Sequence, residues 1–234
     1  MKLAEVVHHD HTLVPIINRF GIHLGFGDDN ITEICEKHQL NLDFFLSILN
    51  GFHDTNYFPK EKLQHFPAAM LIEYLQKAHQ DFLREKLPEI SHLINNMAEE
   101  LPLDKTTSEL ISNFFTVYTR ELTKHILREE EKVYPYILRL EKAISENNKQ
   151  IGEQITENLI SEYESEHDNV EEKLFDLKNI LIKYLPEPQN DKPAYRVLRE
   201  LFTLEKELNE HARIEDLILV PKMKALEAIL KSKK

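Results

Sequence analysis

Beyond residue 67, apolar residues recur every three or four positions, which is the period of an amphipathic helix. Four such stripes are present: Ile72, Leu75, His79 and Phe82; Ile111, Phe115, Tyr118, Leu122, His125, Glu129, Val133 and Tyr136; Ile155, Leu159, Tyr163, His167, Val170, Leu174, Leu177 and Leu181; Val197, Leu201, Leu204, Leu208, His211, Glu215 and Ile218. The segments LPLDKTTS and PEPQNDKP interrupt the pattern. Four long helices with one apolar face each predict an all-α fold, an antiparallel four-helix bundle.

The first 60 residues follow a different pattern, with short helices that begin at capping residues. Asp10, Asn30 and Asn41 each stand directly before an apolar segment, where their side chains can cap a helix. A linker that contains prolines follows. We therefore predict a small helical N-terminal domain over residues 1–58 and the four-helix bundle over residues 59–234.

Prolines lie within or at the end of three of the four long stripes. Proline lacks a backbone N–H and clashes with the preceding turn of a helix. We expect Pro88 to kink or end the first helix, Pro135 to bend the second, and Pro221 to close the regular part of the fourth.

Composition excludes several classes of protein. The chain of 234 residues has 41 acidic against 29 basic residues and a net charge of −12, which argues against a nucleic-acid partner. No run of 18 apolar residues and no signal peptide is evident, so we expect no membrane association and a cytoplasmic location. Cys35 is the single cysteine, which excludes an intramolecular disulfide and a multi-cysteine metal site, and we expect it to be buried.

Two His-x-x-x-Glu pairs lie on the apolar stripes, His125 with Glu129 and His211 with Glu215. Residues four apart share one face of a helix, so each pair can present an imidazole and a carboxylate to one point. One such pair alone is often a surface ion pair, and a single histidine on an apolar face is more often a hydrogen-bonded core residue. Two glutamates on core stripes with no nearby Lys or Arg favour a metal ion instead. Nitrogen and oxygen ligands suit iron, manganese or zinc, and spacing alone does not choose among them.

Other histidines are also candidate metal ligands. His167 lies on the third stripe, about one helix and a turn from both His125 and His211, which suits a ligand from a facing helix. The N-terminal cluster of residues 8–11, HHDH, also offers metal-binding side chains, but such a cluster is more often a solvated terminus.

The segments LIEYLQKAHQDFLREKLPEI, LTKHILREEEKVYPYI, ESEHDNVEEKL and LNEHARIEDLILVPKM resemble the hemerythrin-like domain of the di-iron proteins called repair of iron centres. In that family four histidines and two glutamates hold two non-haem iron ions, and both glutamates bridge the metals. The resemblance implies that five ligands are His125, Glu129, His167, His211 and Glu215.

The sixth ligand position departs from the family pattern. Family members often read His-His or Tyr-His there, and the second residue supplies the ligand, so strict alignment places Gln80 at the site. Helical phase favours His79, which shares its face with Phe82, whereas Gln80 shares its face with Glu73 and Gln76. We therefore predict His79. If neither side chain binds, one iron has an extra open position or the site holds one metal ion.

The N-terminal segment RFGIHLGFGDDNITEIC also resembles the family, with one difference. Two adjacent cysteines of the family are replaced by Gly25 and Phe26. The sequence therefore does not support any step that needs those thiols.

The resemblance implies binding or reduction of a small diatomic ligand, O₂ or NO, in stress response and repair of iron–sulfur centres. Oxygen or redox sensing, or iron storage, without catalytic turnover is the alternative, and a helical interaction module with a vestigial site is a third. Tyr163 and Tyr118 lie near the histidines and could hydrogen-bond a ligand, although packing is the favoured role. The expected partners are the diatomic ligand and, as an option left open, a second copy of the chain.

Overall fold

The computed structural model describes residues 1–146, 169–185 and 190–232. Within these ranges the regular elements are all helices, and the one β-type feature is an isolated bridge between Lys2 and Asn30. The prediction of an all-α fold is therefore confirmed. No helix in the described ranges is long and apolar enough to cross a bilayer.

The chain divides into two compact units, and each is built from two separate segments of the sequence. The first unit comprises Met1–Ala78 with Arg213–Lys222, and the second comprises His79–Ala212 with Met223–Lys234. The predicted boundary between residues 58 and 59 stays a prediction, because compactness alone does not define a folding domain.

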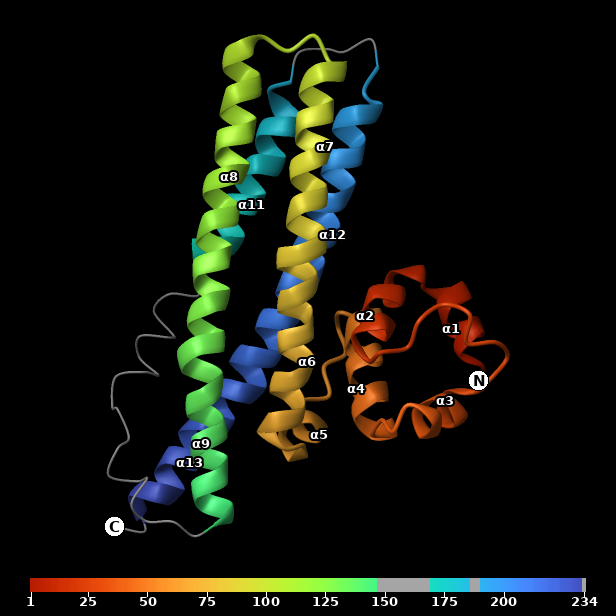
Figure 1. Ribbon diagram of the computed structural model, residues 1–234, viewed down its shortest axis with the longest axis vertical. Coiled ribbons are helices and arrows are strands. Elements are labelled where there is room, and N and C mark those ends of the chain that lie inside the picture. The colour runs from red at the N-terminus through yellow and green to blue at the C-terminus, as the bar shows by residue number, and fades with distance from the viewer. Residues whose placement is uncertain (147–168, 186–189, 233–234) are drawn as a thin grey trace. The chain divides into compact units, whose positions relative to one another are not determined.

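Short helices build the first unit (Figure 1). They are α1 (Leu3–His9), the 3₁₀ helix η1 (His11–Leu13), α2 (Val14–Arg19), α3 (Ile31–Lys37), α4 (Leu42–His53), α5 (Lys60–His65) and most of α6 (Ala68–Asp81). The predicted caps are present: Asp10 accepts from the backbone N–H of Thr12, and Asn30 and Asn41 accept from the third residue of α3 and of α4. An aromatic cluster of Phe20, Phe44, Phe45, Phe66 and Tyr74 packs the unit.

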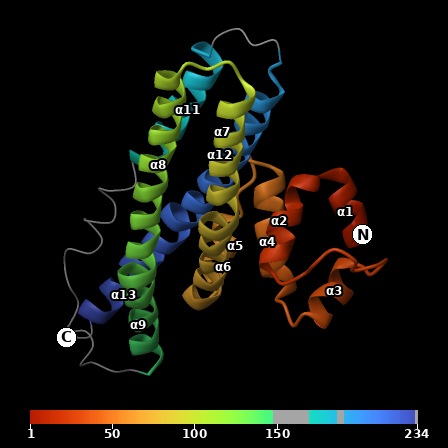
Figure 2. The ribbon, with the colours of Figure 1, turned by 45° about the horizontal axis from the view of Figure 1, so that its top comes forward.

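Long helices build the second unit. They are α7 (Leu87–Glu100), α8 (Lys105–Arg128), α9 (Tyr134–Ser145), α11 (Asn169–Lys183) and α12 (Lys192–Ile214), which continues into α13 (Val220–Ser232). Figures 1 and 2 both show α7, α8, α11 and α12 side by side. Ion pairs join neighbours within this group: Lys173 with Glu121, Lys178 with Glu205, and Arg196 with Glu100. These helices form the four-helix bundle that the apolar stripes predict.

The predicted apolar stripes face the interior of this bundle. The buried members are Ile111, Phe115, Tyr118 and Leu122 on α8, Leu174, Leu177 and Leu181 on α11, and Val197, Leu201 and Leu204 on α12. Burial of a branched or aromatic side chain contributes about 1.5–3 kcal/mol, so these stripes are the main source of bundle stability. The residues of the third stripe before Asn169, which include Tyr163 and His167, lie outside the described residues.

In the described part of the chain, three helices contain a five-residue π-helical segment: η2 (Phe82–Lys86), η3 (Glu129–Val133) and η5 (Glu215–Leu219). In each case the residue after the segment donates its backbone N–H to the carbonyl of the first residue, five positions back. The wider turn adds one residue relative to an α-helix. Such π turns occur often at functional sites, and two of these three begin at a predicted ligand.

A proline follows each π segment at the second position, at residues 88, 135 and 221. Pro88 and Pro135 occupy the first turn of α7 and α9, directly after the π segment. The chain stays helical beyond all three prolines. The expectations that Pro88 could end the first helix and that Pro221 closes the fourth were therefore wrong, since α7 runs to Glu100 and α13 to Ser232.

Candidate metal centre

Four buried side chains bring their ligand atoms to one place. They are His79 of α6, Glu129 at the start of η3, His211 of α12 and Glu215 at the start of η5. Each offers an imidazole nitrogen or a carboxylate oxygen, and these atoms all lie within 4.8 Å of one another. Two carboxylates and two imidazoles are a donor set that suits a divalent transition metal, and their negative charge would be neutralised by it. The residues present therefore fit a metal ion.

The Nε2 atom of His79 makes two short contacts within this cluster. It lies 3.0 Å from Nε2 of His211 and 3.3 Å from Oε2 of Glu129. The two imidazoles are tilted by 39°, with ring centroids 4.7 Å apart. Ring nitrogens that face each other at this distance are placed as ligands of one ion would be. Phe82 packs edge-on against His211 and closes this side of the cluster with an apolar wall.

His125 contacts the cluster through Glu129. Its Nε2 atom lies 3.1 Å from Oε1 of Glu129, one helical turn further on. The carboxylate thus directs one oxygen to His125 and the other to His79. His125 is 19% exposed and is not one of the four converging side chains, so it occupies the outer end of the group.

The environment of Glu129 favours its ionised form. Burial alone would raise the pKa of this carboxyl, but the neighbouring imidazoles of His125 and His79 hold the pKa well below its usual range. An ionised carboxylate held between two imidazoles is ready to accept a cation without first losing a proton.

The helical period predicted that His79, and not Gln80, lies on the buried face of the first helix. His79 is 2% exposed and reaches the cluster, whereas Gln80 is exposed. Alignment with the family pattern would have selected the exposed residue. Metal binding stays a prediction for five residues: His79, His125, Glu129, His211 and Glu215. The sixth candidate, His167, lies outside the described residues.

Glu130 orients His79 and was not identified from the sequence. Its Oε1 atom accepts a hydrogen bond from Nδ1 of His79 at 2.8 Å. With the proton on Nδ1, the lone pair of Nε2 faces the cluster, which is the tautomer that binds metal. In the sequence Glu130 stands in a run of three glutamates that is typical of a solvated face. The partner on another helix could not be inferred from that pattern.

Replacement of Glu130 by alanine is expected to weaken metal binding about 10- to 100-fold, because it removes the group that fixes the ring and tautomer of His79. Competition with a chromophoric chelator for zinc or ferrous iron measures this affinity. The matched control is Glu131→Ala, which removes an exposed carboxylate at the next position. Equal affinities of the two variants would show that Glu130 does not act on the site.

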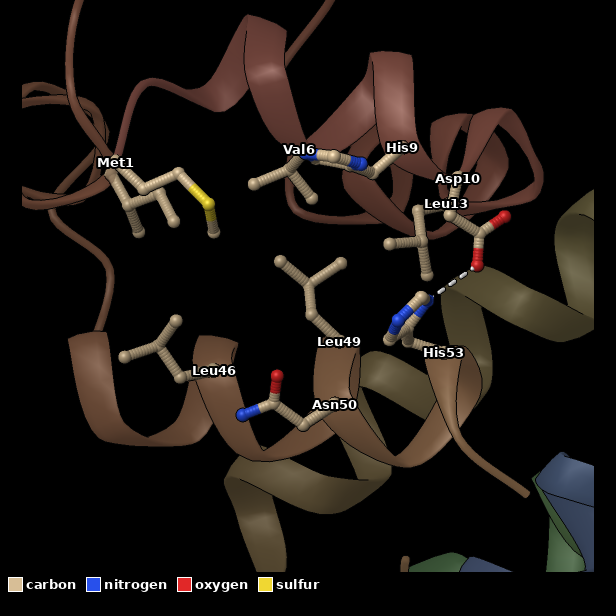
Figure 3. A pocket seen from close by; sticks show the side chains of 10 residues that line it. Met1, Val6, His9, Asp10, Leu13, Leu46, Leu49, Asn50 and His53 are labelled. Carbon is tan, nitrogen blue, oxygen red and sulfur yellow. Dashed lines mark hydrogen bonds and ion pairs between the residues drawn. The ribbon is translucent and has the colours of Figure 1, made fainter. Parts of the chain in front are cut away.

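A separate hollow lies within the first unit, between α1, η1 and α4 (Figure 3). It has a volume of about 240 Å³, and Val6, Leu13 and Leu49 supply apolar walls. Asp10 and His53 close one side with an ion pair of 2.8 Å. Asp10 is thus engaged as a helix cap and an ion-pair partner. Within the described ranges, the residues at 8–11 form no group of three metal-binding side chains close enough to hold an ion.

The cysteine and the positions of the missing thiols lie in this first unit. Cys35 is buried, as predicted, and burial raises the pKa of its thiol. Gly25 adopts a left-handed backbone with φ of +96°, a conformation that a side chain rarely adopts.

Comparison with known proteins gives consistent results. Residues 70–223 match the Hemerythrin HHE cation binding domain. The iron-sulfur cluster repair protein ScdA of Staphylococcus haemolyticus is 20% identical over 225 residues, covering 94% of this chain and 96% of that protein. The iron-sulfur cluster repair protein YtfE of Salmonella paratyphi B is 26% identical over 206 residues, covering 86% of each chain, and YtfE of Salmonella newport gives the same values.

Proposed function

The chain belongs to the hemerythrin HHE cation-binding family, and from this premise we propose that it is a non-haem di-iron protein. In this proposal it binds or reduces a small diatomic ligand, NO or O₂, as part of a stress response that repairs iron–sulfur centres. The named relatives, ScdA and YtfE, support the repair role because each aligns over most of its length.

The position of Glu129 carries the di-iron proposal. One carboxylate oxygen lies 3.1 Å from Nε2 of His125 and the other 3.3 Å from Nε2 of His79. A carboxylate with each oxygen directed to a different imidazole is arranged as a bridge between two cations would be. We propose that His79, Glu129, His211 and Glu215 hold one end of the pair, and that His125, with His167, serves the other.

Iron bound here would supply electrons and open coordination positions for the diatomic ligand. The chain's own residues do the rest. Glu130 holds the proton on Nδ1 of His79, and Phe82 covers His211 from one side. Four of the proposed ligands are at most 6% exposed, so bulk water has little access to the site and electrostatic interactions within it are strong.

A binding role without turnover is the second candidate, and one observation favours it. Gly25 and Phe26 stand where the resembled family has its two cysteines, so this chain lacks the thiols that a thiol-dependent repair step would use. Sensing of oxygen or redox state, or storage of iron, needs the metal cluster but not those thiols. Manganese or zinc would also satisfy the same nitrogen and oxygen donors.

Anaerobic purification followed by metal analysis and visible spectroscopy is the test. The expected result is about two iron ions per chain, with charge-transfer absorption after exposure to air. NO is then added to the reduced protein without air. Release of nitrous oxide indicates reduction, and a stable nitrosyl adduct indicates binding alone. A colourless chain without metal, whose helicity survives His125→Ala, would contradict both and favour the interaction module.

A further inference from the structure

We propose that Tyr134 donates a hydrogen bond to a small anionic or polar ligand held on the Nε2 side of His79. The phenol oxygen lies 3.5 Å from Nε2 of His79, the ring nitrogen that also faces His211 and Glu129. Tyr134 is 1% exposed, and its ring stacks parallel to the imidazole, at 3° and 5.6 Å between centroids. The hydroxyl therefore lies beside a proposed ligand atom.

The π segment η3 explains why this residue faces the cluster. In an α-helix a residue five positions after Glu129 would lie about 140° around the axis, away from the ligand face. Here the backbone N–H of Tyr134 donates to the carbonyl of Glu129, so residues five apart lie one above the other. The extra residue of the π turn thus brings the phenol to the face that carries Glu129.

Tyr134 is also distinct among equivalent positions. The residues that follow the π segments η2, η3 and η5 are Leu87, Tyr134 and Val220. All three are buried, and in these segments only the one beside His79 carries a polar group. A buried phenol hydroxyl needs a hydrogen-bond partner, and the contact that it makes here is with a proposed metal ligand.

The chemistry of His79 defines the kind of ligand. A metal ion on Nε2 would take the lone pair that now faces the phenol, and the hydroxyl would then be beside a cation. At 3.5 Å the present contact is long for a hydrogen bond, so its replacement would cost little. The O–H would then be available to an acceptor atom of a small anion bound there. The phenol would therefore favour ligands with an exposed lone pair or negative charge.

This inference rests on the proposed function, and azide is the probe that tests it. The iron-loaded, oxidised protein is titrated with azide, and the dissociation constant is read from visible absorption. Tyr134→Phe is expected to retain the iron content of the unaltered chain and to bind azide about tenfold more weakly, the effect of one charge-assisted hydrogen bond. Tyr136→Phe is the matched control, since it removes a buried hydroxyl of the same helix that donates to Glu227.

A second measurement detects the hydrogen-bond donor directly. The azide stretching frequency is recorded in water and in heavy water, and a shift between the two solvents reports an exchangeable donor on the ligand. The shift is expected in the unaltered chain and in Tyr136→Phe, and it should be absent in Tyr134→Phe.

The outcomes separate this inference from the function on which it rests. A chain that holds no iron overturns both. If the chain holds iron and binds azide, but Tyr134→Phe has the same dissociation constant and the same solvent shift, only the role of Tyr134 is overturned. Loss of iron from Tyr134→Phe overturns it as well, because the phenol would then be needed to hold the metal.

Discussion

Replacement of Glu129 by glutamine is expected to remove most of the bound metal, leaving less than one ion per chain after desalting. The change keeps the shape of the side chain but removes its charge. In the native chain this carboxylate directs its two oxygens to His79 and His125, and it is 1% exposed. Removal of one partner from a buried charged group costs about 3–5 kcal/mol, so affinity should fall on the order of a hundredfold to a thousandfold.

The matched control is Glu131→Gln, two residues further along η3. This glutamate is exposed, so the same chemical change is made in the same helix away from the cluster. Atomic absorption after anaerobic reconstitution with ferrous iron counts the ions, and circular dichroism confirms that both variants keep their helices. Full iron content in Glu129→Gln would contradict the proposed bridging role, whatever the behaviour of the control.

The helices of the bundle could be predicted because their apolar residues follow the α-helical period and end in the core. The π segments could not, because a single extra residue inside a helix leaves no clear mark on a pattern of threes and fours. The three prolines were the available sign. They were interpreted as ends or bends, whereas each follows a π turn and the chain stays helical beyond it.

In the candidate site, the residues that could be predicted are those whose arrangement depends on a single helix. His125 with Glu129, and His211 with Glu215, are recognisable because residues four apart share a helix face. The choice of His79 over Gln80 also followed from phase, since its apolar neighbours define the buried side of α6. Each of these inferences uses only the residues of one helix.

Glu130 and Tyr134 were missed for physical reasons. Glu130 acts through His79, a residue of another helix, and a run of acidic residues gives no sign of such a partner. Tyr134 lies five residues after Glu129, a spacing that points away from the site in an α-helix and toward it only across the π turn. A π segment placed from the proline at its end could have identified Tyr134.

Removal of the metal is expected to lower the free energy of unfolding by several kcal/mol. A ligand that binds only the folded chain stabilises it by about 2.7 kcal/mol at 100 times its dissociation constant and by about 4.1 kcal/mol at 1,000 times. The proposed ligands come from α6, η3, α12 and η5, so a bound ion would join segments that the unfolded chain separates. Urea unfolding of the iron-loaded and the chelator-treated protein measures the difference.

Glu129→Gln provides the control for this effect, because it should unfold at the same urea concentration with and without added iron. The metal-free native chain is expected to stay helical, since the buried stripes of α8, α11 and α12 do not depend on the ion. An iron-dependent gain that is equally large in Glu129→Gln would place the stabilising ion elsewhere. The native chain could instead show no gain in stability, even at iron concentrations well above that of the protein. That result would mean that the cluster of His79, Glu129, His211 and Glu215 holds no ion that matters to the fold. Convergent buried donors cannot bind a cation tightly without stabilising the folded state that brings them together.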